Sequence, residues 1–543
     1  MRKTVITLLL AAATLSSFAQ SGYDGLLFSE NNYEGTARSV AMGNAFTALG
    51  GDLGSITINP AGSAVAGYSQ VTITPGITLS TSTAHGVLPP AEYSTLPYFK
   101  NSMESRMSKA SLPNLGFTLD WNTGRSSGPK NITFGFVANR TASFDQDVYA
   151  RGLNSSTSFM GSMAFHATDR YMWADDLDLN VNKNAYDDFP WEYIVGYNSN
   201  MIAVYDGDQD GDFFAGASEL ILDNGEIALG GELEQTYGRR VSGGKQDYVI
   251  NVGTNLSDFL YLGANLGIST LDYDYDEYFM EEAVDPADFP IILDNGDSFY
   301  FKKMKHNYWY NAEGSGVYMK VGAILTPGAG LRLGVAFQTP TTNTITERWQ
   351  YVGSTTFSSQ GQNGYEASPE GNYTYTFSSP YRANFGLAYT LGKFAVLSAD
   401  WEISDYSQMK FESQGYDQDY YDELNNEIKE IFTTSHMLRL GAEVKLGALA
   451  LRGGYGLTTS PEKNFEGSYR SNFSFGLGYS TKGSFFADFA VRKNIYNTEY
   501  YMPYSDYIFG YDEEGNEYVA EPVPELSIMR SDWKILLTLG WRF

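Results

Sequence analysis

The last eleven residues of the chain, 533–543, alternate between apolar and polar side chains. Because successive residues of a β-strand point to opposite faces, the alternation predicts a strand with one apolar and one polar face. The apolar face consists of Trp533, Ile535, Leu537, Leu539, Trp541 and Phe543. The polar face consists of Lys534, Thr538, Gly540 and Arg542, with Leu536 as its one apolar member. Such a strand separates an apolar environment from an aqueous one.

This chemistry is typical of the closing strand of a bacterial outer-membrane barrel, where aromatic residues lie at the membrane edge and polar residues face the lumen. It predicts an all-β fold, a transmembrane antiparallel β-barrel located in the outer membrane. We expect the barrel-assembly machinery to recognise this strand as its signal. The residues of that signal are Leu537, Leu539, Trp541 and Phe543.

The amino-terminal residues 1–19 have the pattern of a secretory signal peptide. A basic start, Met1-Arg2-Lys3, precedes a mostly apolar stretch, and small residues occupy the positions that a signal peptidase reads before Gln20. The apolar stretch is too short to span a bilayer as a helix, and no later run of about 18 apolar residues follows. The sequence therefore predicts export without a transmembrane helix.

Composition narrows the class of protein further. The chain has 41 Tyr and 56 Gly and is 43% hydrophobic, which suits many amphipathic strands with aromatic girdles. The absence of cysteine excludes disulfides, thiolate metal sites and cysteine nucleophiles. A net charge of −28 excludes nucleic acid as a natural partner and points away from a basic, lipid-binding patch. Solvated acidic loops explain this charge, and a cation-bridged outer face is the alternative.

Runs of period two, bounded by turn residues, predict about fourteen strands. The runs are 69–81, 111–122, 130–144, 245–256, 258–274, 313–326, 330–345, 381–391, 393–406, 434–446, 448–457, 470–480, 484–497 and 531–543. An even number of strands allows an antiparallel barrel to close. Charged residues within these runs fall on the face that a wet lumen tolerates.

The links between the runs alternate between short and long, which predicts short periplasmic turns and long extracellular loops. The long links are 82–110, 145–244, 275–312, 346–380, 407–433, 458–469 and 498–530. We therefore expect one barrel domain, 68–543, whose largest extracellular loops are 145–244 and 275–312. The first of these loops is large enough to fold as a lid.

The segment 20–67 does not have the pattern of a barrel strand. Its stretch 39–51 is rich in small residues and predicts a short helix that ends at paired glycines. Low charge and many Ala and Gly residues suit a hatch that plugs the lumen. A periplasmic tail is the alternative, although tails are usually more polar.

This segment resembles the hatch of the FadL/TodX-type (OmpP1-like) outer-membrane transporters of hydrophobic compounds. The resemblance begins with Gly43-Asn44-Ala45-Phe46 and Asn59-Pro60-Ala61-Gly62. It continues through the stretches 263–267, 331–340, 380–382 and 401–407 to the last strand, with the long loops unmatched. The residues assigned to the hatch are Gly43, Asn44, Phe46, Asn59, Pro60, Ala61 and Gly62.

The resemblance implies a fourteen-stranded barrel, plugged by its hatch, that passes long-chain fatty acids or aromatic hydrocarbons. In that family, extracellular loops capture the molecule, the hatch shifts, and the molecule leaves sideways through the wall at an inward kink of the third strand. By position, Gly135 and the stretch 139–141 are the place for such a kink in this chain. No energy-coupling segment is visible, so transport is expected to be passive.

The predicted loop 275–312 contains an unusual concentration of apolar residues. Apolar groups in an exposed loop often mark an interaction site, so a hydrophobic capture groove is one interpretation. Packing of loop against loop is the alternative. The residues assigned to ligand binding are Phe289, Ile291, Ile292, Leu293 and Phe299.

The stretch 206–212 matches the first half of a calcium-binding loop, because carboxylates at alternate positions can converge on one cation. Its candidate ligands are Asp206, Asp208, Asp210 and Asp212. The position of the bidentate glutamate holds Ala217, and Glu219 comes two residues late. A Ca²⁺ site and a solvated acidic turn are therefore both open; no other cofactor is expected.

The sequence favours a transport protein over an enzyme. The chain has four histidines, at 85, 166, 306 and 436, and their spacing suggests neither a metal site nor a catalytic base. His436, at the predicted rim, leaves a barrel phospholipase as a minor alternative. So few histidines also disfavour haem uptake. The expected partners are a hydrophobic small molecule and outer-membrane lipid or lipopolysaccharide, and the chain is expected to be a monomer. A surface adhesion or scaffold protein, anchored by its barrel, is the alternative function.

Overall fold

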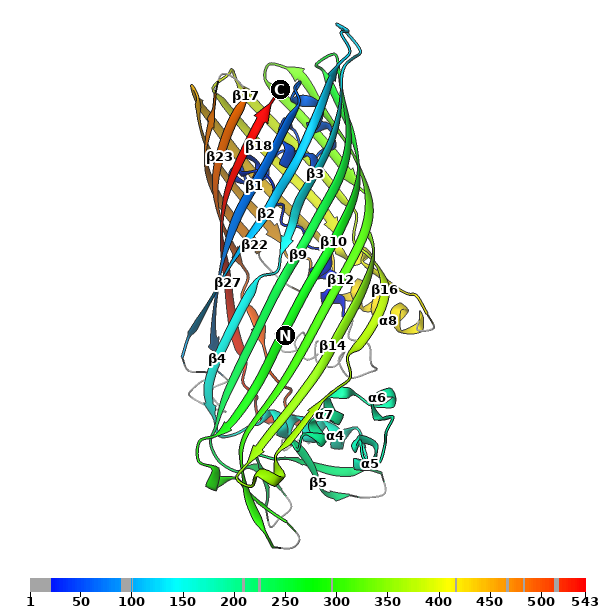
Figure 1. Ribbon diagram of the computed structural model, residues 1–543, viewed down its shortest axis with the longest axis vertical. Coiled ribbons are helices and arrows are strands. Elements are labelled where there is room, and N and C mark those ends of the chain that lie inside the picture. Colours follow the sequence, from blue (N-terminus) through cyan, green and yellow to red (C-terminus); the bar gives the residue numbers. More distant parts are fainter. Residues whose placement is uncertain are drawn as a thin grey trace.

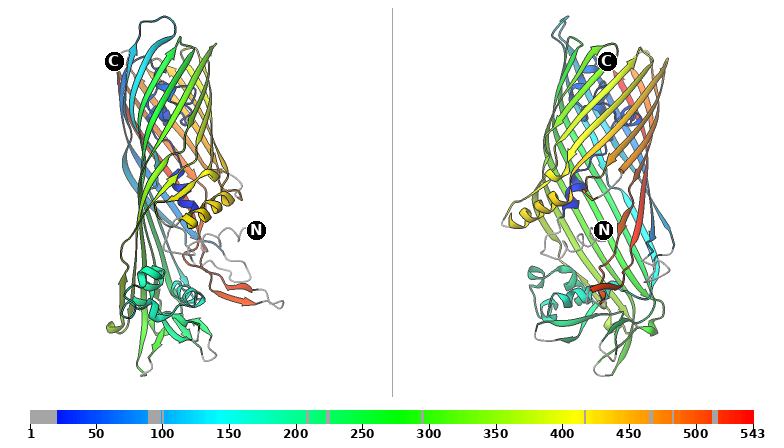
Figure 2. Two further views of the ribbon diagram at one scale, coloured as in Figure 1. Left: turned by 90° about the vertical axis from the view of Figure 1, so that its right-hand side faces the viewer. Right: turned by 180° about the vertical axis from the view of Figure 1, so that it is seen from behind.

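The computed structural model describes residues 21–543 except 89–98, 100, 208–209, 223–225, 294–295, 416–417, 465–467, 482–483 and 512–516. Its main element is a closed antiparallel barrel that is taller on one side than on the other (Figures 1 and 2). The wall has fourteen strand positions, several of which consist of two consecutive strands. Antiparallel pairing of the last strand with the first closes the ring from Gln70↔Arg542 to Gly86↔Leu526. The fold class predicted from the sequence is confirmed.

The strand positions follow one another around the wall in chain order. They are β1 (Gln70–Gly86), β2 (Met103–Asn122), β3 (Pro129–Ser143) with β4 (Gln146–Asn154), β9 (Leu233–Leu256), β10 (Leu260–Ala283), β12 (Ser298–Gly328), β13 (Leu331–Gln338) with β14 (Thr342–Phe357), β16 (Gly371–Ser378) with β17 (Arg382–Leu391), β18 (Ala395–Asp405) with β19 (Lys410–Ser413), β20 (Thr434–Leu446), β21 (Leu449–Thr459), β22 (Ser468–Ser480), β23 (Phe485–Tyr496) with β24 (Glu499–Tyr501), and β27 (Leu526–Arg542). Each of the fourteen predicted runs overlaps one of these positions.

The connections divide the barrel into two ends. Short links such as Leu256 to Leu260 and Leu446 to Leu449 gather at one end, which we call the turn end, together with the carboxyl terminus (Figure 1). The long links gather at the opposite end, which we call the loop end. The predicted alternation of short and long connections is therefore present around the wall.

The outer surface of the wall near the turn end is an apolar band. On β27 the outward residues Trp533, Leu537 and Trp541 are exposed, whereas the inward residues Lys534 and Thr538 are buried. On β10 the outward side chains Leu262, Leu266 and Ile268 are also exposed. An apolar outer face with a polar lumen is the surface pattern of a barrel that lies in a membrane.

The predicted loop 275–312 is wrong over most of its length, because β10 runs to Ala283 and β12 begins at Ser298. These strands continue the hairpin beyond the apolar band. The outward residues Asp272, Asp274 and Asp276 of β10 are acidic, so outward apolar residues no longer mark the strand beyond the apolar band. The long link in this hairpin is therefore only 284–297, with η4 (Pro286–Asp288) and β11 (Pro290–Ile292).

The insertion between β4 and β9, residues 155–232, folds as a compact unit that we call the cap (Figure 1). It contains α4 (Phe159–Asp169), α5 (Ala174–Leu177), α6 (Ala185–Asp188), α7 (Trp191–Asn198), β5 (Ile202–Gly207), β6 (Asp212–Gly216), β7 (Glu219–Ile221) and β8 (Ile227–Leu229). Its apolar core is continuous with the loop ends of β10 and β12 through Phe279, Phe301 and Met304. The cap is thus anchored to the taller side of the barrel.

Two further segments lie at the middle of the barrel. Residues 21–66, which we call the N-terminal segment, contain α2 (Gly22–Ser29), α3 (Ala37–Ala41), η2 (Leu53–Thr57) and η3 (Pro60–Val65). The amphipathic helix α8 (Gln418–Ile431) packs its buried side against α2.

The smaller elements at the loop end are β15 (Gly364–Ala367), η5 (Gln360–Gln362), η6 (Tyr406–Gln408), β25 (Ile508–Tyr511) and β26 (Glu517–Glu521). Among the described residues, no helix combines the length and the apolarity that crossing a membrane requires.

The cap contains a carboxyl group that makes its stability depend on pH. Burial against α4, reinforced by the nearby carboxylate of Glu281, raises the pKa of Glu219 to about 7, although the Gly216 N–H donates to it at 2.8 Å. A raised pKa in the folded state stabilises the protonated form, so this contribution is present below pH 4.5 and is lost as the pH rises through 7. We expect limited proteolysis of the cap to be several-fold slower at pH 5.5 than at pH 8.5. The variant Glu219→Gln should lose most of this difference, and an unchanged pH dependence would contradict the assignment.

Candidate functional site

The N-terminal segment lies inside the barrel and touches its inner wall at glycines. A β-carbon on Gly454 would lie 2.1 Å from the backbone N of Gly43, and one on Gly334 would lie 2.1 Å from the carbonyl oxygen of Thr47. A β-carbon on Gly263 would lie 2.3 Å from the carbonyl carbon of Pro60. Side chains at these three wall positions would therefore push the N-terminal segment out of place.

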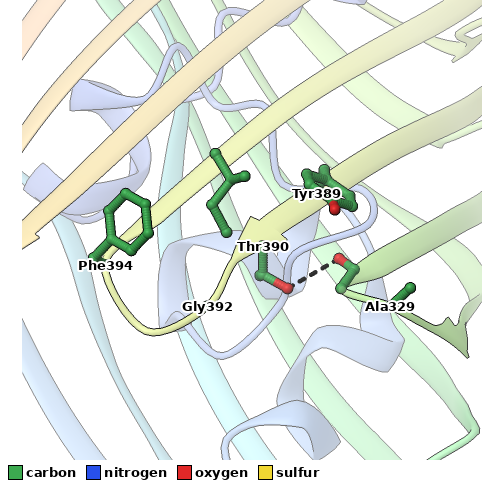
Figure 3. A pocket seen from close by; sticks show the side chains of 7 residues that line it. Ala329, Tyr389, Thr390, Gly392 and Phe394 are labelled. Carbon is green, nitrogen blue, oxygen red and sulfur yellow. Dashed lines mark hydrogen bonds between the residues drawn. The ribbon is translucent and has the colours of Figure 1, made fainter.

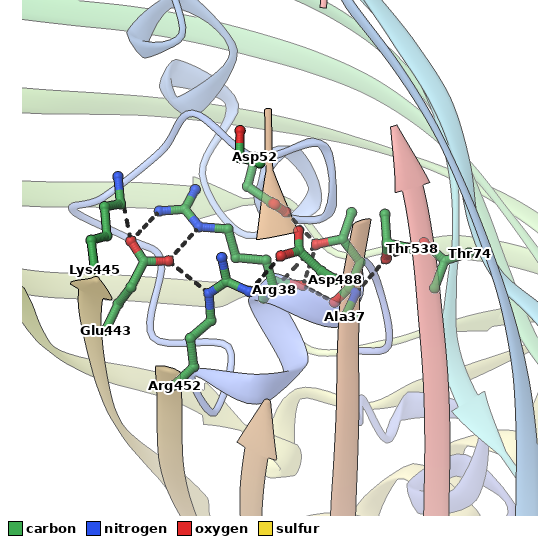
Figure 4. Close-up of polar contacts among 12 residues, drawn as sticks. Ala37, Arg38, Asp52, Thr74, Glu443, Lys445, Arg452, Asp488 and Thr538 are labelled. Carbon is green, nitrogen blue, oxygen red and sulfur yellow. Dashed lines mark hydrogen bonds and ion pairs between the residues drawn. The ribbon is translucent and has the colours of Figure 1, made fainter. Parts of the chain in front are cut away.

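Buried ion pairs hold α3 of this segment to the wall (Figure 4). Arg38 donates to both carboxylate oxygens of Glu443, at 3.0 and 3.3 Å, and Arg452 donates to Glu443 at 2.7 Å and to Asp488 at 2.6 Å. The side chain of Glu443 has no exposed area. Because Glu443 is shared by two arginines, removing it leaves Arg38 without this carboxylate and Arg452 with Asp488 alone, in a site of low polarity.

A second cluster of charges holds the middle of the segment. The backbone N–H and the hydroxyl of Thr47 donate to Asp400 at 2.8 and 2.7 Å, and Arg439 bridges Asp400 to Glu402. Arg382 completes this cluster by donating to Glu402 at 3.2 Å. The inner wall thus supplies the hydrogen-bond partners that a short, irregular segment cannot supply for itself.

The residues predicted to form the hatch are all buried inside the barrel. Asn44, in the left-handed region at φ 59°, donates to the carbonyl of Tyr33 at 2.7 Å. Phe46 lies beneath the Arg38 guanidinium, 5.4 Å from the ring centre. Asn59 donates to the carbonyl of Thr47 at 2.6 Å and accepts the Ala61 N–H at 3.1 Å. The structure brings these motif residues together into one packed turn.

The Asn59 turn continues directly into η3, which begins at Pro60 and includes Ala61 and Gly62. Gly62 is packed against Gly50, because a β-carbon on Gly62 would lie 3.1 Å from the Gly50 α-carbon. The Gly51 N–H also donates to the carbonyl of Gly62 at 2.8 Å. The Asn-Pro-Ala-Gly motif therefore folds back on the paired glycines that precede it.

The ladder of the wall is interrupted on one side of β2. Strand β2 pairs with β3 only from Asn122↔Asn131 to Asn114↔Asn139, whereas it stays paired with β1 as far as Met103↔Ala84. Within the fully described stretches 103–122 and 129–154, residues 103–113 pair with neither β3 nor β4. This half of β2 therefore presents an unpaired edge, which we call the wall opening.

The strand opposite this edge is kinked into the lumen. The register of β3 with β9 shifts between Arg140 and Ala142, and the strand stops at Ser143 before resuming as β4. Arg530 of β27 donates to the carbonyls of Ser143 and Asp145 at 3.4 and 3.2 Å. Because β1 and β2 separate β27 from β3 in the wall, these contacts require the kink to turn inward. The register shift lies at the stretch 139–141, to which the family resemblance assigns the kink, whereas Gly135 lies in regularly paired strand.

Charged groups tie the kink to both neighbouring strands. Lys109 of β2 reaches across the wall opening to Asp145, with its Nζ 3.0 Å from the carboxylate. On the other side Arg140 donates to the carbonyl of Gly243 at 2.8 Å. Gly243 has φ 110°, and a β-carbon there would lie 2.1 Å from the carbonyl oxygen of Asp272. Only glycine fits the strand opposite the kink.

An aromatic cluster lines the lumen beside the kink and above the N-terminal segment. Its members are Phe28, Phe144, Tyr273, Tyr310, Trp349, Tyr375, Phe377, Phe411 and Tyr421. Phe144 of the kink packs edge-on against Tyr273 at 5.4 Å, and Phe28 of α2 contacts Tyr273 at 6.4 Å and Phe377 at 6.2 Å. The cluster therefore joins the kink, α2 and the tall side of the barrel in one apolar surface.

Two hydroxyls of this cluster share one carboxylate partner. The hydroxyl of Tyr310 donates to the buried Glu347 at 2.6 Å, and the hydroxyl of Tyr375 donates to the same carboxylate. Lys245 donates to the carbonyls of Phe28 and Glu30 at 2.7 and 2.9 Å, and Arg382 donates to the carbonyl of Ser29. With these two hydroxyls and the Lys245 ammonium engaged, the cluster presents mainly aromatic rings.

The residues predicted to bind ligand do not line this cluster. Phe289 and Phe299 are buried in the core shared by the cap and the strand ends, where Phe289 lies 6.0 Å from the ring of Phe301. Ile291 packs against the same core, whereas Ile292 and Leu293 are exposed at the far edge. This arrangement corresponds to the packing of loop against loop.

Asp206 and Asp212 of the predicted calcium loop lie near the end of β5 and at the start of β6. Asp206 accepts its neighbour's Gly207 N–H, and Asp212 accepts the Ala174 N–H at 2.7 Å, while Asp208 is outside the described residues. Across the described part of the chain, no group of three or more histidine, aspartate or glutamate side chains is placed to hold a metal ion. The Ca²⁺ site stays a prediction.

Several residues of the site carry no signal in the sequence. Lys109, Asp145 and Arg530 are isolated charges in segments separated by up to several hundred residues, and only the kink brings them together. Phe144 stands at the end of a predicted strand without a distinguishing neighbour. Leu536, by contrast, does carry a signal in the sequence, because its apolar side chain lies on an otherwise polar face and so indicates a buried contact. In the structure it packs against Ala37, Val40 and Ala41.

The ion pairs of Glu443 predict how tightly the N-terminal segment is held. Because breaking a buried ion pair costs about 3–5 kcal/mol, Glu443→Ala should open the segment far more often than the parent does. The chain has no cysteine, so Ser39→Cys places a single buried thiol on α3 as a reporter. We expect maleimide labelling of this thiol to be at least tenfold faster with Glu443→Ala. Lys445→Gln, which alters an exposed contact at 3.8 Å from the same carboxylate, is the control and should leave the rate unchanged.

Solved structures of known proteins share this architecture. No family model matches the chain, and no curated protein matches it. Among solved structures, a FadL homologue from Pseudomonas aeruginosa is similar over 95% of this chain and 100% of its own, with 11% sequence identity and a TM-score of 0.52. The toluene transporter TodX of Pseudomonas putida is similar over 94% and 99%, with 11% identity and a TM-score of 0.50.

The identity is low and the coverage is nearly complete, so this likeness concerns the fold. The resemblance indicated by the Gly-Asn-Ala-Phe and Asn-Pro-Ala-Gly stretches is confirmed at that level. The chain has the barrel fold of the FadL homologue and of TodX.

Proposed function

We propose that the chain is an outer-membrane channel that passes apolar small molecules passively and releases them sideways into the membrane. In this proposal the loop end faces outward, the aromatic cluster receives the molecule, and the wall opening lets it leave. The N-terminal segment acts as the hatch, closing the lumen toward the turn end. The same proposal includes assembly through the C-terminal strand and an outer leaflet of lipopolysaccharide around the barrel.

The observation that carries this proposal is the position of the wall opening. Unpaired backbone in an otherwise closed ladder is costly in a membrane, so an unpaired edge needs a reason. Here the edge of residues 103–113 lies opposite a kink whose Phe144 belongs to the aromatic cluster. An apolar molecule on that cluster is therefore next to the gap and does not have to cross the polar N-terminal segment.

The chemistry of the cluster favours an uncharged apolar molecule, such as an aromatic hydrocarbon, over a fatty acid. Glu347, the carboxylate to which Tyr310 and Tyr375 donate, would repel a second carboxylate, and Lys245 is engaged by carbonyls. Offset and edge-on ring contacts suit a further aromatic ring. The name of TodX as a toluene transporter supports the same class of substrate.

The affinity of the aromatic cluster can be measured directly. We expect the purified barrel in maltoside micelles to bind toluene, and Phe377→Ala to weaken that binding about tenfold, because it removes a ring from the centre of the cluster. Phe289→Ala, in the core beside the cap, is the matched control. Isothermal titration should give little binding of decanoate. Equal affinity for decanoate would contradict the preference for an uncharged molecule.

Lateral release can be tested by closing the wall opening. Lys109 and Asp145 face each other across it, so the variant Lys109→Cys/Asp145→Cys should form a bridge on oxidation. We expect oxidised cells to take up radiolabelled toluene at least fivefold more slowly than reduced cells. The matched control is Arg151→Cys/Glu234→Cys, which bridges β4 and β9 where the ladder is intact. Full uptake through a quantitatively bridged opening would refute lateral release.

A surface adhesion or scaffold protein is the second candidate, and the folded cap is the observation that favours it. The cap has its own apolar core and an acidic, exposed face with Asp175, Asp187 and Asp188 among its residues. In that case the barrel would bind no apolar molecule. A chain that shows no toluene binding and no difference in uptake between oxidised and reduced cells would favour this candidate.

A further inference from the structure

The outer, membrane-facing side of the wall has a groove near the turn end. Outward residues of β17, β18, β20 and β21 align in cross-strand rows, because directly paired residues point to the same side. In these rows Ala399, Ala442 and Gly453 stand among leucines and tyrosines. The small residues leave a hollow of about 510 Å³ with a mostly apolar lining. Its size falls within the usual range of ligand sites.

A more polar notch of about 470 Å³ continues this groove toward the turn end (Figure 3). It lies between the link at Gly330 and the turn at Gly392, and Tyr389 lines both hollows. Thr390 donates from its N–H and its hydroxyl to the Gly330 carbonyl, at 2.8 and 2.9 Å. The apolar groove therefore ends at exposed backbone and hydroxyl groups.

A cation stands beside the notch. Lys393 lies between Gly392 and Phe394, which both line the notch, and its side chain is exposed. Within the described ranges, no carboxylate lies close enough to Lys393 to form an ion pair, in contrast to Lys109 and Lys130. On a chain with a net charge of −28, this leaves one cation free for an anion at the edge of the apolar band.

We propose that groove and notch together bind one membrane phospholipid. Its acyl chain lies in the groove over Ala442 and Gly453, and its phosphate lies at the notch beside Lys393. The combination of an apolar channel, a polar end and a cation at the membrane edge fits an anionic, amphipathic molecule. The proposal requires that the barrel lies in a membrane, and it is independent of what the lumen transports.

Two neighbouring glycines at the groove, Gly453 and Gly454, allow the outer face to be changed without changing the lumen. A β-carbon on Gly453 would meet no atom within 4 Å, whereas one on the adjacent Gly454 would collide with Gly43 of the N-terminal segment. Gly453→Leu therefore fills the groove from outside and leaves the lumen untouched. Ala487→Leu is the matched control, because Ala487 lies on β23 among its outward residues, also near the turn end but away from the groove.

The experiment is native mass spectrometry of the full chain in maltoside micelles, titrated with phosphatidylglycerol. We expect the parent and Ala487→Leu to retain one phospholipid, and Gly453→Leu to require about tenfold more lipid for the same occupancy. Lys393→Gln should weaken retention of phosphatidylglycerol more than that of phosphatidylcholine. A heat-dependent shift in gel mobility verifies that each barrel is folded.

Equal retention by Gly453→Leu and Ala487→Leu would overturn the proposal. A dimer of the parent that Gly453→Leu abolishes, with no lipid bound, would also overturn it and assign the groove to a second copy of the chain. Toluene uptake by Gly453→Leu should equal that of the parent. The failure of the lipid site is thus distinguishable from the failure of the transport proposal, which the bridged wall opening tests.

Discussion

Backbone pairing between β27 and β1 is the interaction on which the rest of the structure depends. It turns a sheet into a ring, so that both edge strands lose their free hydrogen-bonding groups. Once the ring is closed, alternation along every strand sorts apolar residues outward and polar residues inward. The lumen that results is lined with charges, and a segment that enters it must supply matching partners. The N-terminal segment does so with Arg38 and Thr47.

The wall opening is a local loss of backbone pairing in this otherwise closed ring. Three features coincide there: the prolines Pro75 and Pro113, which lack an N–H, a register shift between β1 and β2, and the kink after Ser143. Ion pairs and carbonyl contacts from Lys109 and Arg530 hold the kink inward. These contacts partly replace the backbone hydrogen bonds that the wall loses here, so the opening belongs to the folded structure of the wall.

The sequence predicts the wall well because membrane and lumen impose opposite demands on alternate residues. The predicted runs 434–446 and 448–457 therefore match β20 and β21 closely. Prediction fails where that contrast disappears. Beyond Asp272 both sides of β10 meet water or protein, so the sequence pattern predicts a loop where the structure has a strand. The kink could be placed only by family position, and the charges that hold it come together through the fold alone.

The cap enters the chain between β4 and β9, and this placement has a mechanical consequence. Both strands that carry the cap border the region of the kink, and β4 is paired only with β9. The core of the cap also contains Ala84 of β1 and Leu526 and Ile528 of β27, so the cap touches the seam that closes the ring as well as the strands beside the kink. A displacement of the cap therefore acts on the closing seam and on the kinked strand together.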